Sequence, residues 1–161
     1  MSSLLSIDPG LTGTGWALWV PPFKRPCLLG VIKTGKGEWW DRAQSIADQI
    51  VEHCDTHTRV VAEFTEYHAA VTSSMGWKTG DLQRLTFLCG AIAGRVYPRK
   101  FLPVTASGWK GQLPKDVAAK RIEAIIGRKA CQRLGLPEIK RRSDTHAWDA
   151  VGIGLWALDR F

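Results

Sequence analysis

Four side chains with cation-binding chemistry stand at three separate places in the sequence. Asp8 ends a short apolar run at residues 4–7, and Glu63 ends a second, mostly apolar run. His146 and Asp149 are three residues apart, a spacing that puts both on the same face of a helix. Carboxylate oxygens are preferred ligands of Mg²⁺ and Mn²⁺, and Mn²⁺ in particular also accepts an imidazole. We therefore expect these four residues to be catalytic and to bind metal, if the fold brings them together.

Two such cations about 4 Å apart could activate a water molecule and stabilise a leaving oxygen, which is the chemistry of phosphodiester hydrolysis. Each residue also has a simpler interpretation when it is taken alone. Asp8 with the following Pro-Gly pair is a common turn signal. Glu63 could face water at a strand end, Asp149 could be an exposed helical acid, and His146 could be a hydrogen-bonded histidine of the core. The metal-site interpretation requires all four to meet at one point.

The pattern of apolar residues predicts the elements that must position these side chains. Three strands joined by short connections indicate an antiparallel meander, and a strand reached through the first helix should lie parallel to the first strand. Asp8 and Glu63 would then stand side by side at the carboxyl ends of adjacent strands. Strands are expected at about residues 4–8, 15–20, 27–34, 59–64 and 101–105, and helices at about 39–53, 81–96, 116–126 and from Ser143 or Asp144 to 158.

This order of elements predicts an α/β fold with a five-stranded mixed β-sheet flanked by α-helices on both faces. The 161 residues suit one domain, and we expect a single domain over residues 1–161. Residues 65–80 and 106–115 are polar and contain glycine, so we expect loops there. One stripe on the second helix is formed by Leu82, Leu85, Cys89, Gly90 and Gly94. It is a candidate dimer contact, or else it only faces the chain's own core.

The chain carries 22 Lys and Arg residues against 15 Asp and Glu residues, a formal net charge of +7. A basic domain favours polyanionic partners, and nucleic acid is the first of these. The four cysteines are widely spaced and form no Cys-x-x-Cys pair, which indicates reduced thiols. We expect neither a signal peptide nor a membrane-spanning segment. The expected location is the cytoplasm.

Four stretches resemble motifs of the RuvC family of Holliday junction resolvases, in the RNase H-like superfamily. They are SIDPGLTGTGW from residue 6, VVAEFTEYH from residue 60, VTASGWKGQLPKDVAAKRI from residue 104 and HAWDAVGIGLWAL from residue 146. The resemblance covers nearly the whole chain and preserves the order of the motifs. It implies an RNase H-like fold and a single RuvC-like nuclease domain, either cellular or of the compact type found in phages.

The resemblance also implies a homodimeric hydrolase of DNA recombination and repair. Such an endonuclease binds a four-way DNA junction and makes paired symmetric nicks, using two Mg²⁺ or Mn²⁺ ions per active site. The metal-binding catalytic residues would be Asp8, Glu63, His146 and Asp149, although many family members have Asp at the position of His146. The expected DNA-binding residues are Tyr67, Trp77, Lys78, Lys110, Lys115, Lys140, Arg141 and Arg142, with Tyr67 or Trp77 stacking near the crossover.

Two other functions share parts of this pattern. An RNase H-like nuclease that cuts branched DNA broadly, or RNA in RNA/DNA hybrids, would keep the metal site and differ in its substrate groove. A non-catalytic junction-binding module would keep the basic residues without needing the carboxylates. An actin-like ATPase is excluded because that fold needs two such domains, and 161 residues are too few. The sequence identifies no branch-migration helicase as a partner.

Overall fold

A single mixed β-sheet forms the centre of the protein. The computed structural model describes residues 2–65, 79–97, 101–138 and 145–161. The strand order is β3-β2-β1-β4-β5, with β1 antiparallel to β2 and parallel to β4. The five-stranded mixed sheet predicted from the sequence is therefore confirmed. The strands are β1 (Leu4–Asp8), β2 (Thr14–Trp19), β3 (Leu28–Ile32), β4 (Arg59–Glu63) and β5 (Phe101–Val104).

The register between β1 and β4 brings the two strand-end acids together. Ile7 pairs with Ala62 in this parallel ladder, so Asp8 and Glu63 are the next residues on neighbouring strands. Because side chains alternate between the two faces of a sheet, residues that share a register position share a face. Asp8 and Glu63 therefore stand side by side at the carboxyl ends of the two central strands, as the sequence predicts.

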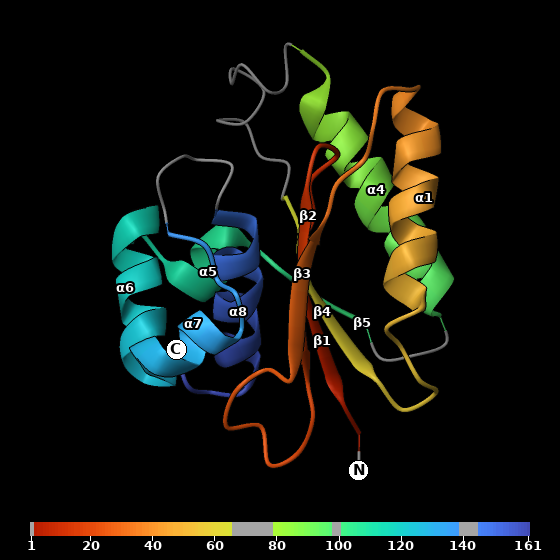
Figure 1. The fold of residues 1–161 in the computed structure, drawn as a ribbon. Helices are drawn as coiled ribbons and strands as arrows, with labels where there is room; N and C mark the ends of the chain where they lie inside the picture. Colours follow the sequence, from red (N-terminus) through yellow and green to blue (C-terminus); the bar gives the residue numbers. More distant parts are fainter. Residues whose placement is uncertain (1, 66–78, 98–100, 139–144) are drawn as a thin grey trace.

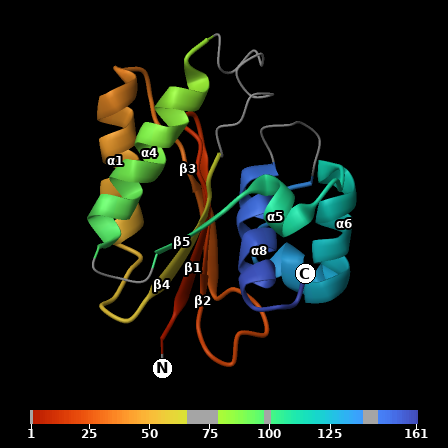
Figure 2. The same ribbon diagram turned by 180° about the vertical axis from the view of Figure 1, so that it is seen from behind.

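Helices cover both faces of the sheet (Figure 1 and, from behind, Figure 2). On one face, α1 packs against α4. On the other face, α8 lies against the central strands, and α5, α6 and α7 lie around it. The helices are α1 (Trp39–Val51), α4 (Asp81–Val96), α5 (Ala106–Lys110), α6 (Lys115–Ile126), α7 (Arg128–Arg133) and α8 (His146–Ala157). No helix in these described ranges is long and apolar enough to span a membrane.

The alternation along β1 divides the core into two layers. Leu5 and Ile7 pack with the helices α1 and α4, whereas Leu4 packs with α8 on the opposite face. Ser6 belongs to the α8 face as well, where its hydroxyl accepts a 2.9 Å hydrogen bond from the indole of Trp19. By the same alternation Asp8 points to the α8 side. The face of the sheet that carries the acid is thus the face covered by the last helix.

The first turn of α8 lies directly against the start of β2. A β-carbon at Gly15 would collide with the backbone carbonyl of His146, so only glycine permits this approach. The helix is apolar on nearly all sides, and every residue from Ala147 to Leu155 is buried. Such a helix belongs between the sheet and a further layer, here α5 and α6. This contact sets His146 and Asp149 beside the carboxyl end of β1.

The structure corrects two predictions. The expected loop at residues 106–115 begins with helix α5, because the side chain of Thr105 caps it by accepting a 3.0 Å hydrogen bond from the backbone of Gly108. The expected dimer stripe on α4 does not lie on one face: Cys89 is buried in the chain's own interior and Leu85 packs there too. Gly90 and Gly94 lie on the exposed side of the helix.

The remaining boundaries agree with the predictions to within about two residues. Gly127 follows α6 with a positive φ of 91°, as expected for a helix-ending glycine. The N-cap position of α8 is Thr145. The predicted caps Ser143 and Asp144 lie outside the described residues, and so does nearly all of the loop expected at residues 65–80. A short helix, α7, occupies the start of the basic stretch after Gly127.

Candidate active site

Asp8 and His146 form the closest pair of the site. The Nδ1 atom of His146 lies 2.7 Å from Oδ2 of Asp8, and both side chains are largely buried. Burial raises the pKa of the Asp8 carboxyl, and the negative charge of Asp149 raises this pKa further, while the bond to His146 opposes both. The hydrogen bond to Asp8 raises the pKa of His146 against the effect of its own burial. Because Nδ1 faces the carboxylate, the other ring nitrogen, Nε2, lies on the side of the Gly10–Gly13 turn, where a β-carbon at Gly13 would be 3.8 Å from it.

The turn after β1 fixes the other side of the His146 ring. A β-carbon at Gly10 would lie 3.4 Å from Cε1 of His146, and one at Gly13 would lie 3.4 Å from Cδ2. The turn is closed by Thr14, whose hydroxyl donates a 2.9 Å hydrogen bond to the carbonyl of Gly10. Gly10 and Gly13 of the first sequence motif therefore lie where the backbone of the turn packs closely against the His146 ring.

Glu63 is held by the indole of Trp109. The Nε1–H group of Trp109 donates a hydrogen bond of 2.7 Å to Oε2 of Glu63. Burial raises the pKa of Glu63, and the neighbouring negative charge of Asp8 adds to this increase. The indole bond acts in the opposite direction because it stabilises the ionised carboxylate. The charge of Asp149 raises the pKa of both Asp8 and Glu63, so the two acids share one electrostatic environment.

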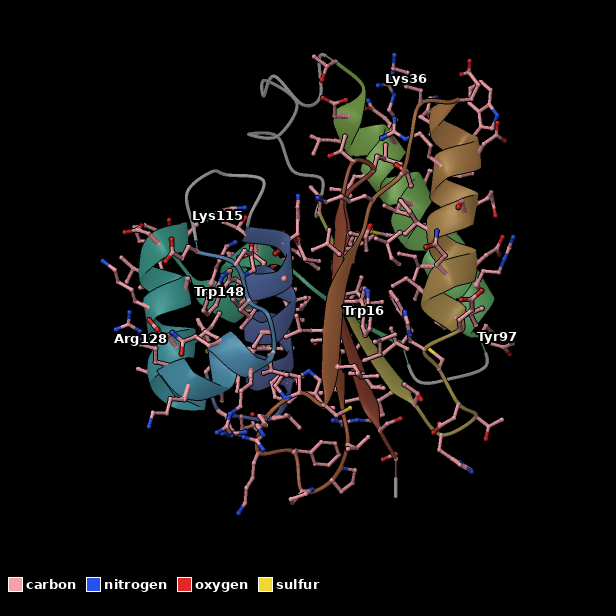
Figure 3. The ribbon with its side chains drawn as sticks, in the orientation of Figure 1. Trp16, Lys36, Tyr97, Lys115, Arg128 and Trp148 are labelled. Carbon is pink, nitrogen blue, oxygen red and sulfur yellow. The ribbon has the colours of Figure 1, made fainter. Side chains whose placement is uncertain are left out.

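Asp149 forms ion pairs with two lysines that reach it from different helices. Nζ of Lys115, at the start of α6, lies 3.1 Å from Oδ2 of Asp149 and 3.1 Å from the hydroxyl oxygen of Thr145. Nζ of Lys110, at the end of α5, lies 3.8 Å from Oδ1 and also sits 4.7 Å from the centre of the Trp109 ring. The Lys115 side chain is 39% exposed and that of Lys110 is 13% exposed. Figure 3 shows Lys115 near the same end of the molecule as the amino end of α8.

The only cysteine found at the site among the described residues is an inert thiol. The sulfur of Cys89 lies 3.6 Å from the backbone carbonyl of Glu63, to which it donates. Burial, with the charges of Glu63 and Asp8, raises the pKa of Cys89 to about 12. A thiol with this pKa stays protonated near neutral pH and is a poor nucleophile. Covalent catalysis by Cys89 is therefore not supported.

The sequence predictions for this site fall into two groups. The structure brings together Asp8, Glu63, His146, Asp149, Lys110 and Lys115 at the carboxyl end of the central strands. The other expected DNA-binding residues, Tyr67, Trp77, Lys78, Lys140, Arg141 and Arg142, lie outside the described residues.

Two residues of the site were not singled out from the sequence. Trp109 falls in a stretch whose sequence predicts a loop, and its bond to Glu63 spans 46 residues of sequence, a distance over which no local pattern operates. Thr145 was not considered, although it accepts the hydrogen bond from Lys115. The available signal for Trp109 is its place directly before Lys110, in a stretch that resembles a motif of the RuvC family.

The donor set suits hard divalent cations, as the resemblance implies. Three carboxylates and one imidazole are ligand types that Mg²⁺ or Mn²⁺ can use. Burial first, and then neighbouring negative charge, raises the pKa values of Asp8 and Glu63, and a cation would offset the contribution of that charge. Within the part of the chain that the structure describes, no three of the His, Cys, Asp and Glu side chains are arranged as metal ligands. The oxygen atoms are instead bonded to His146, Trp109 and the two lysines.

Comparison with solved structures identifies the fold type. The chain superimposes on Thermus thermophilus RuvC in complex with a Holliday junction substrate with a TM-score of 0.67 and 20% sequence identity, covering 97% of this chain and 92% of that one. Another T. thermophilus RuvC structure gives 0.62 and 20%, covering 96% and 92%. The yeast mitochondrial Holliday junction resolvase gives 0.56 and 12%, covering 95% and 77%. No family model and no curated protein matches the sequence.

These likenesses place the protein in a class defined by architecture: a five-stranded mixed sheet between two layers of helices. Within that class, its fold is the RNase H-like fold of RuvC. The fold expected from the four sequence motifs is thereby confirmed.

Proposed function

We propose that the protein is a metal-dependent endodeoxyribonuclease that resolves four-way (Holliday) DNA junctions by paired symmetric nicks. The observation that carries this proposal is the meeting of Asp8, Glu63, His146 and Asp149 at one end of the sheet, beside two lysines. Acids and bases in this arrangement suit the hydrolysis of a phosphodiester, and the net charge of +7 suits a nucleic acid substrate. The fold, which is that of RuvC, supports the choice of a branched DNA.

Asp8, Glu63, His146 and Asp149 would hold two Mg²⁺ or Mn²⁺ ions. When bound, such ions supply an activated water and charge stabilisation for the leaving oxygen. Among the protein's own groups, Asp8 orients the His146 ring through its contact with Nδ1. The carboxylates of Glu63 and Asp149 are acceptor-only when ionised, so they bind cations and repel bare phosphate.

Lys115 is the more accessible of the two lysines and is our candidate for the phosphate contact. Its ammonium group lies at the site and its side chain is 39% exposed, so a DNA phosphate could replace Thr145 as its partner. Lys110 is enclosed between the Trp109 ring and Asp149, which suits a role in balancing the charge of the site. Both lysines keep positive charge within reach of the strand to be cut.

A four-way junction has two-fold symmetry and needs two cuts, whereas one chain provides one site. We therefore propose a C2 homodimer, whose symmetry matches that of the junction. The exposed side of α4 is the candidate contact, since Phe87 is 41% exposed there and Gly90 and Gly94 leave open space above the helix.

The alternatives are a broader nuclease of branched DNA or RNA/DNA hybrids, and a junction-binding module without activity. Cleavage of a panel of matched substrates distinguishes them: a four-way junction, a three-way junction, a flap, a linear duplex and an RNA/DNA hybrid, each with Mg²⁺ and with Mn²⁺. The proposal predicts preferred cutting of the four-way junction. Equal cutting of all branched forms, or of the hybrid, supports the broader nuclease, and binding without metal-dependent cutting supports the module.

A further inference from the structure

Helix α5 carries a tryptophan to the end of β4. The helix has five residues, follows directly on the edge strand β5 and is capped by Thr105. This placement turns Trp109 inward, where it is only 3% exposed, and leaves the next residue, Lys110, facing Asp149. Two consecutive residues of one short helix thus reach two different acids of the proposed active site.

The indole ring of Trp109 packs against α8 at Gly152. A β-carbon at Gly152 would collide with Cζ3 of the ring, so the absence of a side chain there makes room for it. The ring of Phe161 approaches from another direction at 5.4 Å, edge to face. Gly152 stands three residues after Asp149 on the same helix face. The helix that carries Asp149 therefore also fixes the orientation of the Trp109 indole.

The fixed ring presents its single hydrogen-bond donor to a single carboxylate oxygen. Nε1 of Trp109 lies 2.7 Å from Oε2 of Glu63, a short distance for a bond from an uncharged donor. An indole nitrogen donates only and cannot accept, so the contact favours the ionised carboxylate. The bond involves only one of the two carboxylate oxygens of Glu63. This geometry selects one orientation of a carboxylate that would otherwise rotate freely at a strand end.

We propose that Trp109, whose ring packs against Gly152, is a positioning residue that orients Glu63 for the cleavage reaction. The inference rests on the proposed nuclease function, and it adds a residue that touches neither the substrate nor the metal. Residues that orient metal ligands in this way typically contribute 10–100-fold to activity or to metal affinity. Helix α8 would then carry two of the proposed ligands, His146 and Asp149, and would also hold the tryptophan that orients the third, Glu63.

Trp109→Phe tests this role, because phenylalanine keeps most of the ring and removes the donor. We expect kcat on a four-way junction to fall about 10–100-fold, with KM for the junction unchanged. Trp19→Phe is the matched control: Trp19 is fully buried, its indole donates to Ser6, and its ring is seated on Gly154 of the same helix. It lies at the opposite end of the sheet, so kcat should change less than about threefold.

A second measurement examines the contact without metal or substrate. Glu63→Gln, in metal-free protein labelled with ¹⁵N, replaces an anionic acceptor by a neutral one. The indole N–H resonance of Trp109 should move upfield, while that of Trp19 should stay in place. The chain has eight tryptophans, so the two resonances are assigned from the Trp109→Phe and Trp19→Phe variants, or by triple-resonance assignment of ¹³C,¹⁵N-labelled protein if Trp109→Phe does not fold.

The outcomes separate this inference from the proposed function. An unmoved Trp109 resonance, or a Trp109→Phe enzyme that cuts as fast as the Trp19→Phe control, would overturn the positioning role while leaving the nuclease intact. A parent protein that cuts no substrate would refute the nuclease and with it the catalytic role of Trp109. The resonance shift would then still show a structural bond between the two residues.

Discussion

Nδ1 of His146 lies 2.7 Å from Oδ2 of Asp8, a contact that joins the last helix to the first strand across 138 residues of sequence. The pair couples two titrations, because the carboxylate favours the imidazolium and the imidazolium favours the carboxylate. The pKa of His146 is raised chiefly by this hydrogen bond, and that of Asp8 is raised chiefly by burial. This one contact therefore links the protonation of the first strand's carboxylate to that of the last helix's imidazole.

His146 variants test whether the imidazole is a ligand. His146→Asp should retain cleavage and shift the metal preference from Mn²⁺ towards Mg²⁺, because it completes an all-oxygen set of ligands. His146→Ala should lose about 10–100-fold in cleavage rate. Rates measured across a titration of each metal decide the question. Equal rates for His146→Ala and the parent, with both metals, would make His146 a histidine of structural importance only.

The pH dependence of cleavage should reflect the protonation of His146. Its pKa is raised above 6.5, so the ring holds its proton to a higher pH than a free histidine. A protonated ring cannot ligate, and the rate should therefore fall as the pH drops through this raised pKa. The His146→Asp enzyme should lack that limb of the pH–rate profile. If both enzymes show the same profile between pH 6 and 9, roughly the range in which a raised histidine pKa would appear, another group controls the rate.

Glu63→Gln should stabilise the metal-free protein near neutral pH. Because the folded-state pKa of Glu63 is raised above 4.5, ionisation of this group costs stability as the pH rises through the folded pKa. The amide keeps an oxygen for the Trp109 donor and removes the burial cost of the charge and its repulsion with Asp8. Each kcal/mol gained would raise Tm by about 2–4 °C.

Thermal unfolding in a chelator, at neutral pH and below pH 4.5, measures this effect. The gain in Tm should shrink on acidification, because the parent's Glu63 is then protonated in both the folded and the unfolded state. A Glu63→Gln variant that is less stable than the parent at neutral pH would contradict this prediction. It would show that the contacts of the ionised carboxylate in the folded protein outweigh the cost of burying its charge.

The sequence predicted the sheet and its acids because both follow from local patterns. Apolar runs that end at Asp8 and Glu63 define the central strands, and the helix between them requires a parallel pairing. The spacing of His146 and Asp149 on one helix gave the other half of the site. Each of these inferences needs only a short stretch of chain and a general rule of topology.

The parts that were missed depend on contacts between distant segments. Helix α5 contains Gly108 and has only five residues, so it shows no apolar period, and its stability comes from the Thr105 cap and from burying Trp109. For the stripe on α4 the sequence leaves a dimer contact and the chain's own core both open, because periodicity alone cannot tell an interface from an interior. The structure decides this for Cys89 by burying it against Glu63.

Lys115→Glu should weaken junction binding and flatten its dependence on salt. Losing one phosphate contact lowers the slope of log K against log salt concentration by about 1. Lys24→Glu is the matched control, since Lys24 is exposed in the β2–β3 connection, at the opposite end of the sheet from Asp8. Binding titrations without metal, at several salt concentrations, compare the two. Identical slopes for both variants would exclude Lys115 from the phosphate contacts.

Phe87→Asp should dissociate the proposed dimer. Phe87 is 41% exposed on α4, and Val117, which is 40% exposed on α6, provides a control site of equal exposure on the other face of the sheet. Sedimentation at micromolar concentration should give a dimer for the parent and for Val117→Asp, and a monomer for Phe87→Asp. A dimer that survives Phe87→Asp would move the contact elsewhere, and a monomeric parent that still makes paired cuts would contradict the dimer itself.

Mapping the nicks on a four-way junction, with all four strands end-labelled, is the most direct measurement of the central claim. The parent, with Mg²⁺ or Mn²⁺, should cut two opposing strands at symmetric positions. Asp149→Asn should slow cutting by on the order of 10³-fold or more while binding the junction at least as tightly, because it removes a charge that repels phosphate and holds cations. Cutting by Asp149→Asn at the parent's rate, or cuts spread without symmetry over all four strands, would contradict the account.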